Sequence, residues 1–436
     1  MTALNNPIVF ASSGSDTAAS GSERALGSSV VSGQVQWSSG TNYGTLSTVS
    51  GLSVGDLLWS PTSTGRQFNV ISLIVGTTVY FDSNWDSTEY GTAFYVGGKR
   101  QTFDNASSRR IFENDASNWS IETESDQTLT STIRIKSGGS DSYIKGTGDN
   151  RVLTQTANEP VFEIDAVTGN VRFENLTFKN SYTGGTKTRG HGVEYMASTS
   201  SSYTLTFSDC VFGDATNDLR VGIDANNYSW SVNVVRCKFT NCFIAIMQTS
   251  GGGGVNANIV ESVIDSSTNE GLYLTGGSDA NIHGCIISNN GGTGIYGTNR
   301  VNVTDSICFN NGGHGMSILG EQLSSTVVNC VFVNNSALGI NSGVSTPMGS
   351  IVDCSFFGNT SGQMSLSQTA SGTITLTGDP FQNSASGNFQ LNQTSGEGQD
   401  VRDISVLLDS TTTHPMLRLT NEAAAGGGSI FHPLGG

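Results

Sequence analysis

The sequence is poor in charge and in proline. Of its 436 residues, 13% are charged and seven are proline. A disordered chain would carry more net charge per residue, more proline and fewer aromatic residues than the 20 Phe and 11 Tyr found here. Apolar residues at helical spacing are scarce, and no apolar run approaches the roughly 18 residues of a membrane-spanning helix. We therefore expect a packed all-β chain without membrane insertion, whose 55 glycines serve tight turns.

Basic residues are also scarce, with 20 Lys and Arg against 36 Asp and Glu and a net charge of −16. Because binding to nucleic acid needs clustered Lys and Arg, we expect no nucleic-acid partner. The opening stretch, MTALNNPIVFASSGSD, lacks the basic and apolar regions of a signal peptide. We therefore expect folding in a cytoplasm, with the seven cysteines as free thiols.

What the chain does contain is a repeat of about 24 residues, visible as a set of short segments such as FSDCVF, VVNCVF and IVDCSF. The fourth residue of each segment is always small. These residues are Cys210, Cys237, Ser262, Cys285, Ser306, Cys330 and Cys354. Five of the seven cysteines thus share one structural position. Stacked coils place like residues over like, so we expect a narrow buried column of thiols and hydroxyls.

Two further columns follow the same repeat. The first holds polar turn residues, namely Asn180, Asp214, Asn241, Ser266, Asn289, Asn310 and Asn334. The second holds a glycine before an apolar residue, at Gly222, Gly271, Gly294, Gly315 and Gly339. We expect left-handed backbone and stacked amides in the first column, and positive φ at a sharp corner in the second.

This column pattern resembles the right-handed parallel β-helix superfamily, which includes pectate-lyase-like enzymes, related glycanases and phage tailspikes. The resemblance covers residues 170–366 and continues upstream through Trp119–Ile121 and Val161–Ile164. It implies a solenoid of parallel strands with about one coil per repeat. GDPFQNSASGNFQL, at 378–391, resembles the closing segment that follows such repeats, and we expect it to cap the C-terminal end.

We divide the chain into four parts. Residues 1–33 are rich in Ser, Gly and Ala and are expected to form an arm, and residues 34–98 a small β-barrel or sandwich of four to six strands that attaches to a particle. Residues 99–377 form the β-helix, and residues 378–436 a cap followed by an extended arm.

Enzymes of the resembled superfamily place acids and bases on the outer face of one sheet. Asp209, Arg236, Lys238 and Glu261 flank the small-residue column on three adjacent coils and form the candidate catalytic set. In a lyase, carboxylates of such a set would gather a cation and Arg or Lys would abstract a proton. The preferred interpretation is a solvent-facing ladder of ion pairs. Acids elsewhere stay open as alternatives, namely Asp214, Asp218, Asp224 and Asp279.

The five histidines are scattered. His191 in RGHGV and His314 in GGHGM occupy equivalent corners, and we expect both to bond turn backbone. No Cys or His spacing matches a zinc site. We therefore expect neither a metal ion nor a cofactor.

The sequence favours a phage virion protein over an enzyme. A β-helix without an export signal suits a tailspike, a fibre or a capsid-decorating protein that assembles in the host cytoplasm. The expected partners are other virion proteins, through the N-terminal domain and the C-terminal arm, further copies in a homotrimer, and a host-surface polysaccharide. The alternatives are a secreted, extracellular polysaccharide lyase or glycosidase and a bacterial surface adhesin, both of which need an export signal.

Overall fold

The computed structural model describes residues 8–10, short segments between 36 and 100, and most of 119–404. The gaps within this last part are 136–140, 149, 166–168, 197–202, 217, 226–230, 250–255, 276–278, 321–324, 344–348 and 366–369. The arm predicted at 1–33, apart from Ile8–Phe10, and the arm beyond residue 404 lie outside the described residues.

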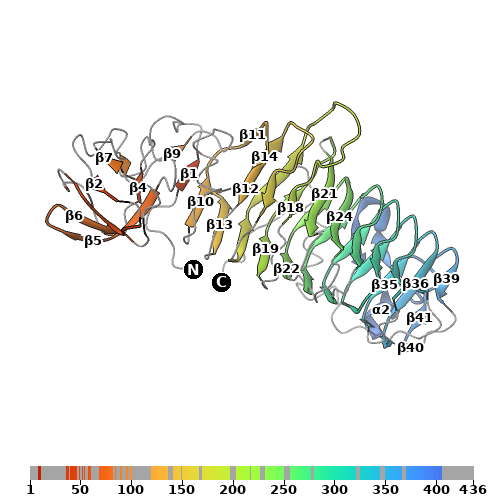
Figure 1. Cartoon of the computed structure of the whole chain (residues 1–436). Helices are drawn as coiled ribbons and strands as arrows, with labels where there is room; N and C mark the ends of the chain where they lie inside the picture. The colour runs from red at the N-terminus through yellow and green to blue at the C-terminus, as the bar shows by residue number, and fades with distance from the viewer. Residues whose placement is uncertain are drawn as a thin grey trace.

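Between Trp119 and Thr375 the chain winds into a parallel β-helix with three sheets (Figure 1). Each coil adds one strand to each sheet, and neighbouring strands within every sheet are parallel. The predicted all-β solenoid is confirmed.

Sheet 1 has 13 strands. In spatial order they are β9 (Lys99–Arg100), β1 (Ile8–Phe10), β10 (Trp119–Thr123), β13 (Ser142–Gly146), β16 (Val171–Glu174), β19 (Thr204–Ser208), β22 (Ser231–Val235), β25 (Asn256–Val260), β28 (Asp279–His283), β31 (Val301–Thr304), β34 (Thr326–Val328), β37 (Ser350–Val352) and β40 (Ala370–Ser371). Strand β1 comes from the segment predicted as an arm, and its pairing with β9 and β10 extends the sheet at its N-terminal end.

Sheet 2 has 11 strands and sheet 3 has ten. Sheet 2 comprises β11 (Gln127–Leu129), β14 (Arg151–Gln155), β17 (Leu176–Asn180), β20 (Val211–Phe212), β23 (Lys238–Thr240), β26 (Val263–Asp265), β29 (Ile286–Ser288), β32 (Ile307–Phe309), β35 (Val331–Val333), β38 (Ser355–Phe357) and β41 (Ile374–Thr375). Sheet 3 comprises β12 (Ile133–Ile135), β15 (Phe162–Ile164), β18 (Val193–Tyr195), β21 (Leu219–Ala225), β24 (Cys242–Thr249), β27 (Leu272–Thr275), β30 (Ile295–Gly297), β33 (Met316–Ile318), β36 (Leu338–Ser342) and β39 (Gly362–Met364).

Before the solenoid lies a separate sheet of seven strands, whose pairings are antiparallel. Its strands in spatial order are β7 (Glu89–Tyr90), β2 (Gln36–Trp37), β3 (Tyr43–Thr45), β6 (Thr78–Phe81), β5 (Phe68–Val75), β4 (Leu57–Trp59) and β8 (Tyr95–Val96). It forms the N-terminal end of an elongated molecule (Figure 1).

The small-residue column is buried along its whole length, and all seven cysteines are free thiols, as predicted. Cys and Ser can replace each other in this column because both side chains make the same hydrogen bond. Cys210 Sγ donates to the carbonyl oxygen two residues earlier at 3.3 Å, and Ser262 Oγ does so at 2.8 Å. A serine also accepts a hydrogen bond from the preceding coil, since Cys237 N donates to Ser262 Oγ at 3.1 Å. The column therefore satisfies polar backbone inside an apolar core.

The turn column corrects one prediction. Asn241, Asn289, Asn310 and Asn334 do adopt left-handed backbone, with φ between 51° and 55°. In this column Asn310 Nδ2 donates to Asn289 Oδ1 at 2.8 Å, as predicted for stacked amides. The continuous ladder of amides, however, lies one residue later. Its buried members, whose Nδ2 groups donate to the Oδ1 atom of the next coil at 2.8–2.9 Å, are Asn290, Asn311 and Asn335, followed by Asn359. The left-handed residue bends the backbone at the corner, so the side chain that points into the core is that of the following residue.

The corner glycines correct a second prediction, because none of them has positive φ. They are required by close approach instead. A Cβ on Gly294 would lie 2.7 Å from the carbonyl oxygen of Gly315 on the next coil. Stacking at the ordinary strand spacing leaves no room there for a side chain.

The C-terminal segment packs against the outer face of sheet 2. It contains β42 (Phe381–Asn383), the 3₁₀ turn η1 (Ser384–Ser386), β43 (Asn388–Leu391) and α2 (Gly398–Ile404). It forms a second apolar core with outward residues of three successive coils, in β29, β32 and β35. This core includes Ile286, Ile307, Phe309, Val331, Val333, Phe381, Phe389, Leu391 and Val401. The sequence predicts that this segment caps the C-terminal end of the solenoid, whereas these contacts lie along the outer face of sheet 2.

The helices of the described residues are short, and none is long and apolar enough to cross a bilayer.

Candidate functional site

A single column of side chains runs along the outer face of sheet 3. In each strand its member lies between two buried residues, as Glu163 does between Phe162 and Ile164. Strand pairing places one member opposite the next from coil to coil. In order the column is Arg134, Glu163, Glu194, Asp224, Met247, Tyr273, Tyr296, Ser317 and Asn341.

The N-terminal part of this column is a network of ion pairs. Glu163 lies 3.1 Å from Arg134 Nε and 3.3 Å from Arg189 NH2. Arg189 also donates to Glu194 Oε2 at 2.7 Å. One guanidinium therefore joins two stacked carboxylates that would otherwise repel each other.

Arg189 belongs to the segment between β17 and β18, which is anchored to the previous coil. Asn158 Oδ1 accepts hydrogen bonds from the backbone N–H groups of Thr188 at 3.0 Å and Arg189 at 3.2 Å. In return, Asn158 Nδ2 donates to Thr188 Oγ1 at 3.0 Å. These bonds fix the segment over sheet 3 before any ligand arrives.

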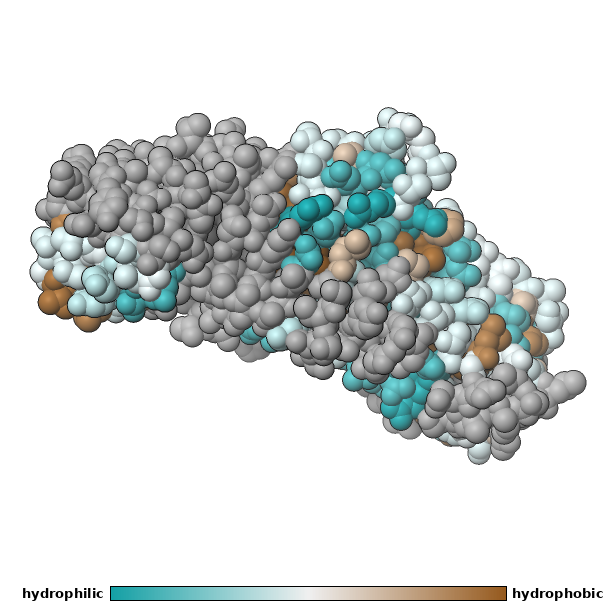
Figure 2. All heavy atoms as spheres, viewed as in Figure 1, coloured by the Kyte–Doolittle hydropathy of each residue, from teal (hydrophilic) through white to brown (hydrophobic). Residues whose placement is uncertain are grey.

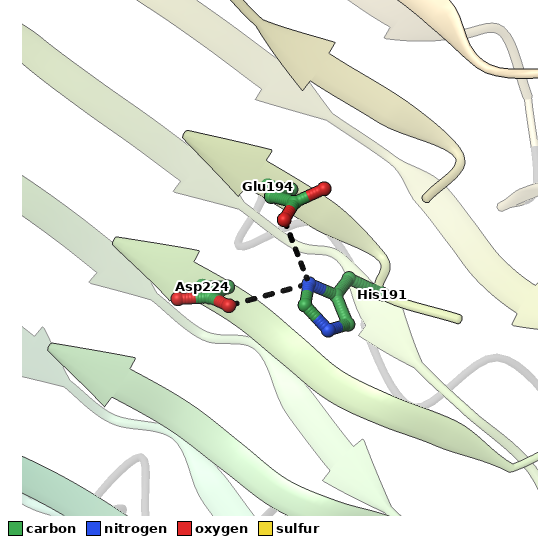
Figure 3. Close-up of side chains that lie close together, drawn as sticks. All are labelled: His191, Glu194 and Asp224. Carbon is green, nitrogen blue, oxygen red and sulfur yellow. Dashed lines mark ion pairs between the residues drawn. The ribbon is translucent and has the colours of Figure 1, made fainter. Parts of the chain in front are cut away.

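His191, two residues later, points its Nδ1 atom between two carboxylates (Figure 3). Nδ1 lies 3.3 Å from Asp224 Oδ2 and 3.8 Å from Glu194 Oε1. All three side chains are buried, with 6%, 3% and 8% of the residue exposed for His191, Asp224 and Glu194. Within the part of the chain that is described, His191 Nδ1 and Asp224 Oδ1 have no hydrogen-bond partner.

Burial shifts the two central titrations in opposite directions. Desolvation, with a smaller contribution from Glu194, raises the pKa of Asp224 to about 7, although Arg220 opposes this shift. Desolvation, together with Arg189 and Arg220, lowers the pKa of His191 to about 4. At neutral pH the imidazole is therefore uncharged, and Asp224 is protonated far more readily than an ordinary carboxyl group.

The C-terminal part of the column has a different chemistry. The rings of Tyr273 and Tyr296 are stacked, with centroids 5.0 Å apart and planes 3° from parallel. Beyond them, Asn341 Nδ2 donates to Ser317 Oγ at 3.1 Å. Along this one column the side chains thus change from buried ionisable groups to aromatic rings and then to neutral polar groups.

The candidate catalytic set from the sequence lies elsewhere. Asp209, Arg236 and Glu261 have left-handed backbone at the corner between sheets 1 and 2, with φ of 54°, 50° and 48°. Arg236 makes a two-pronged pair with Asp209, with both nitrogen–oxygen distances 2.7 Å. Lys238 begins β23 in sheet 2 and pairs in register with Val211 and Val263. The structure therefore gathers three of the four at a corner and places Lys238 on the adjacent sheet.

Sequence reasoning did not single out Glu163, Glu194 or Arg189, and it kept Asp224 only as an open alternative in a loop, whereas Asp224 lies within β21. The signal was present: the residue after each glycine–apolar pair is an outward member of sheet 3. Such triplets are Gly192-Val193-Glu194, Gly222-Ile223-Asp224, Gly271-Leu272-Tyr273 and Gly294-Ile295-Tyr296.

The two equivalent histidines differ. His314 Nδ1 accepts a hydrogen bond from the backbone N–H of Leu338 at 3.2 Å, so it bonds the first residue of β36 on the next coil, where we predict a bond to turn backbone. His191 bonds turn backbone, at Thr188, yet its other nitrogen faces Glu194 and Asp224. Corner position alone did not reveal this difference, because the carboxylates come from two later strands.

Comparison with known proteins supports the fold. Residues 221–389 match the family model described as "Right handed beta helix region", which identifies the parallel solenoid as right-handed. No curated protein matches the chain.

Solved structures similar to the chain include ORF18 of Geobacillus virus E2, with 14% identity, a TM-score of 0.43, and coverage of 59% of this chain and 54% of that one. The Dettilon tailspike protein gp208 has 11% identity, a TM-score of 0.37, and coverage of 59% and 56%. The catalytic domain of a GH87 α-1,3-glucanase has 13% identity, a TM-score of 0.36, and coverage of 79% and 87%. The matched region spans a little more than half the length of the first two proteins, and at such scores these likenesses carry no argument about function.

Proposed function

We propose that the protein is a displayed rod that binds a polysaccharide along the outer face of sheet 3. The observation that carries this proposal is the continuous outward column, in which stacked tyrosines follow a buried ionic cluster. Coils repeat at about 4.8 Å, so the five members from Met247 to Asn341 span roughly 19 Å. Four of them, Met247, Tyr273, Tyr296 and Asn341, are partly exposed, so an extended polymer can contact this part of the strip over several coils.

The tyrosine pair supplies the chemistry that sugars need. A phenol ring offers an apolar body and a polar tip, and a sugar ring offers C–H faces bordered by hydroxyls. The neighbouring Asn341, which is partly exposed and donates a hydrogen bond to the buried Ser317, adds an amide group on the same line. A neutral or weakly charged glycan therefore suits the C-terminal part of the column.

The proposed setting is a phage virion, with assembly in the host cytoplasm and the rod present as a homotrimer. The N-terminal sheet supports an attachment role because it exposes large apolar side chains. Tyr43, Leu73 and Val75 are 50%, 49% and 56% exposed. Figure 2 shows apolar surface at the end of the sheet where β5 and β6 meet. Such a patch at the end of a rod suits contact with another virion protein.

Binding is tested with the full-length protein and capsular and cell-wall polysaccharides from candidate hosts, by surface plasmon resonance. We expect the variant Tyr273→Ala/Tyr296→Ala to bind at least tenfold more weakly. Lys238→Ala, on sheet 2, should bind as the wild type does. Equal binding by all three proteins would overturn the proposed surface, and absence of the protein from purified virions by mass spectrometry would overturn the setting.

A cleaving enzyme is the second candidate, and Asp224 favours it. Glycosidases pair one carboxylic acid with one carboxylate, and here a proton-bearing Asp224 lies beside Glu194, which Arg189 holds by a charged hydrogen bond. Release of oligosaccharides by the wild type, lost in Asp224→Asn, would establish cleavage. Binding without release would assign the rod to recognition alone.

A further inference from the structure

The His191 cluster presents three acceptors to one small volume. The imidazole hydrogen-bonds to the backbone of Thr188, and Nδ1 has no hydrogen-bond partner among the described residues. Nδ1 faces Asp224 Oδ2 at 3.3 Å and Glu194 Oε1 at 3.8 Å. A buried nitrogen and two carboxylate oxygens that converge in this way need a shared proton or a cation between them, and the two cases are separated by the titration described below.

We propose that His191 Nδ1, Glu194 Oε1 and Asp224 Oδ2 bind one divalent transition-metal ion of the Zn²⁺ type. The ligand atoms lie within 4.8 Å of one another. Metal–ligand bonds of about 2.0–2.1 Å in a tetrahedron place ligand atoms about 3.3 Å apart. The distances from Nδ1, 3.3 Å and 3.8 Å, are close to that separation, so only a small side-chain movement completes the site.

The donor set decides the class of metal. One imidazole nitrogen with two carboxylates suits Zn²⁺, Co²⁺ or Ni²⁺, whereas Ca²⁺ and Mg²⁺ prefer oxygen ligands throughout. Three protein ligands leave one tetrahedral position for water or a ligand hydroxyl.

Surrounding groups orient the ligands as metal sites require. Arg189 holds the second oxygen of Glu194 at 2.7 Å, and the Thr188 backbone fixes the imidazole. Glu163 bonds Arg189 in turn at 3.3 Å. Such partners fix the rotamers of ligand side chains before the metal binds.

The site is tested on untagged, full-length protein stripped with a chelator, by calorimetric titration with Zn²⁺ and by absorption spectroscopy with Co²⁺. We expect one ion per chain, visible Co²⁺ bands of a four-coordinate site, and at least a hundredfold weaker binding in His191→Gln. The matched control is His283→Gln, because His283 Nδ1 also lies near a carboxylate, 3.2 Å from Asp305 Oδ2, but its side chain is half exposed.

Circular dichroism shows whether each variant folds, and Glu194→Gln provides a second test should His191→Gln unfold. The proposal fails if the wild type binds no stoichiometric ion, or if His283→Gln weakens binding as much as His191→Gln. The titration contains no glycan, so it succeeds or fails independently of the proposed polysaccharide surface.

Discussion

The outer faces of sheets 2 and 3 belong to the same coils, yet they differ in the side chains that they carry and in what covers them. From Ile286 onward the outward residues of sheet 2 are mostly apolar and are covered by the chain's own C-terminal segment. The outward residues of sheet 3 are ionic and aromatic, and no such segment joins them in the apolar cores of the described residues. Coil stacking fixes the inward positions through close packing, whereas the outward positions are free to vary. One face therefore contributes to stability, and the other is the face that we propose for recognition.

The largest expected effect breaks the cover of sheet 2. Phe389 packs edge-to-face on Phe309 and Phe381, with centroids 5.2 Å and 5.1 Å away. Phe389→Ala should lower the free energy of unfolding by about 3–5 kcal/mol, measured by denaturant titration. Tyr296→Ala, its counterpart on sheet 3, should cost less than about 1.5 kcal/mol. Similar losses in the two variants would show that both faces are structural.

A second, smaller effect compares two ion-pair clusters. The side chains of Arg189 and Arg236 are almost equally exposed, at 45% and 43%, but the carboxylates of Glu163 and Glu194 are more deeply buried than that of Asp209. Arg189→Met should therefore destabilise the fold by about 2 kcal/mol, because among the described residues it leaves the buried Glu194 without a cationic partner and Glu163 with Arg134 alone. Arg236→Met should cost at most about 1 kcal/mol. A larger loss of stability in Arg236→Met than in Arg189→Met, measured by thermal and denaturant unfolding, would contradict the view that the ion pairs of sheet 3 are the more strongly coupled cluster.

The smallest effect concerns pH and the metal-free protein. The folded pKa of His191 lies below its usual 6.5, so its contribution to stability grows as pH rises from about 4 to 6.5. The folded pKa of Asp224 lies above its usual 3.8, so its contribution falls as pH rises toward about 7. The two slopes oppose each other in the wild type.

Each single variant should therefore expose the other slope. Relative to wild type, Asp224→Asn should gain stability with rising pH in this window, and His191→Gln should lose it, each by about 1 kcal/mol or more. Denaturant titrations at pH 4, 5.5 and 7 measure both. Parallel curves for the three proteins would contradict the opposed titrations.

The repeat made the solenoid predictable, because a position that recurs every coil must be stacked and its chemistry shows directly in the sequence. The buried Cys and Ser column follows from this logic. The candidate site was harder, since its parts come from different coils and from the segment that carries Arg189 and His191. Alternation along the strand marked Glu194 and Asp224 as outward. Only the coordinates show that Arg189 and His191 turn back over them, because that depends on the hydrogen bonds of Asn158.

The candidate catalytic set of Asp209, Arg236, Lys238 and Glu261 lies next to the small-residue column in the sequence. Left-handed backbone explains why three of these residues lie at a corner. A left-handed residue sits at a bend, so Asp209 and Arg236 pair along the corner and not across a sheet face. Lys238 occupies the outward column of sheet 2, which further along carries Ile286 and the covering segment. The sequence could not show that this face is partly covered, because the cover comes more than a hundred residues later.

The column of buried cysteines also provides a chemical probe of local unfolding at known positions along the β-helix. Each sulfur is buried in its coil, and burial raises the pKa of Cys285 to about 12, which keeps reactive thiolate scarce at neutral pH. Solenoid coils contact mainly their neighbours, so they can fray one after another from an end. Alkylation under mild denaturant, mapped by peptide mass, would then report the order in which the coils that carry Cys210, Cys237, Cys285, Cys330 and Cys354 open, and which end of the rod unfolds first.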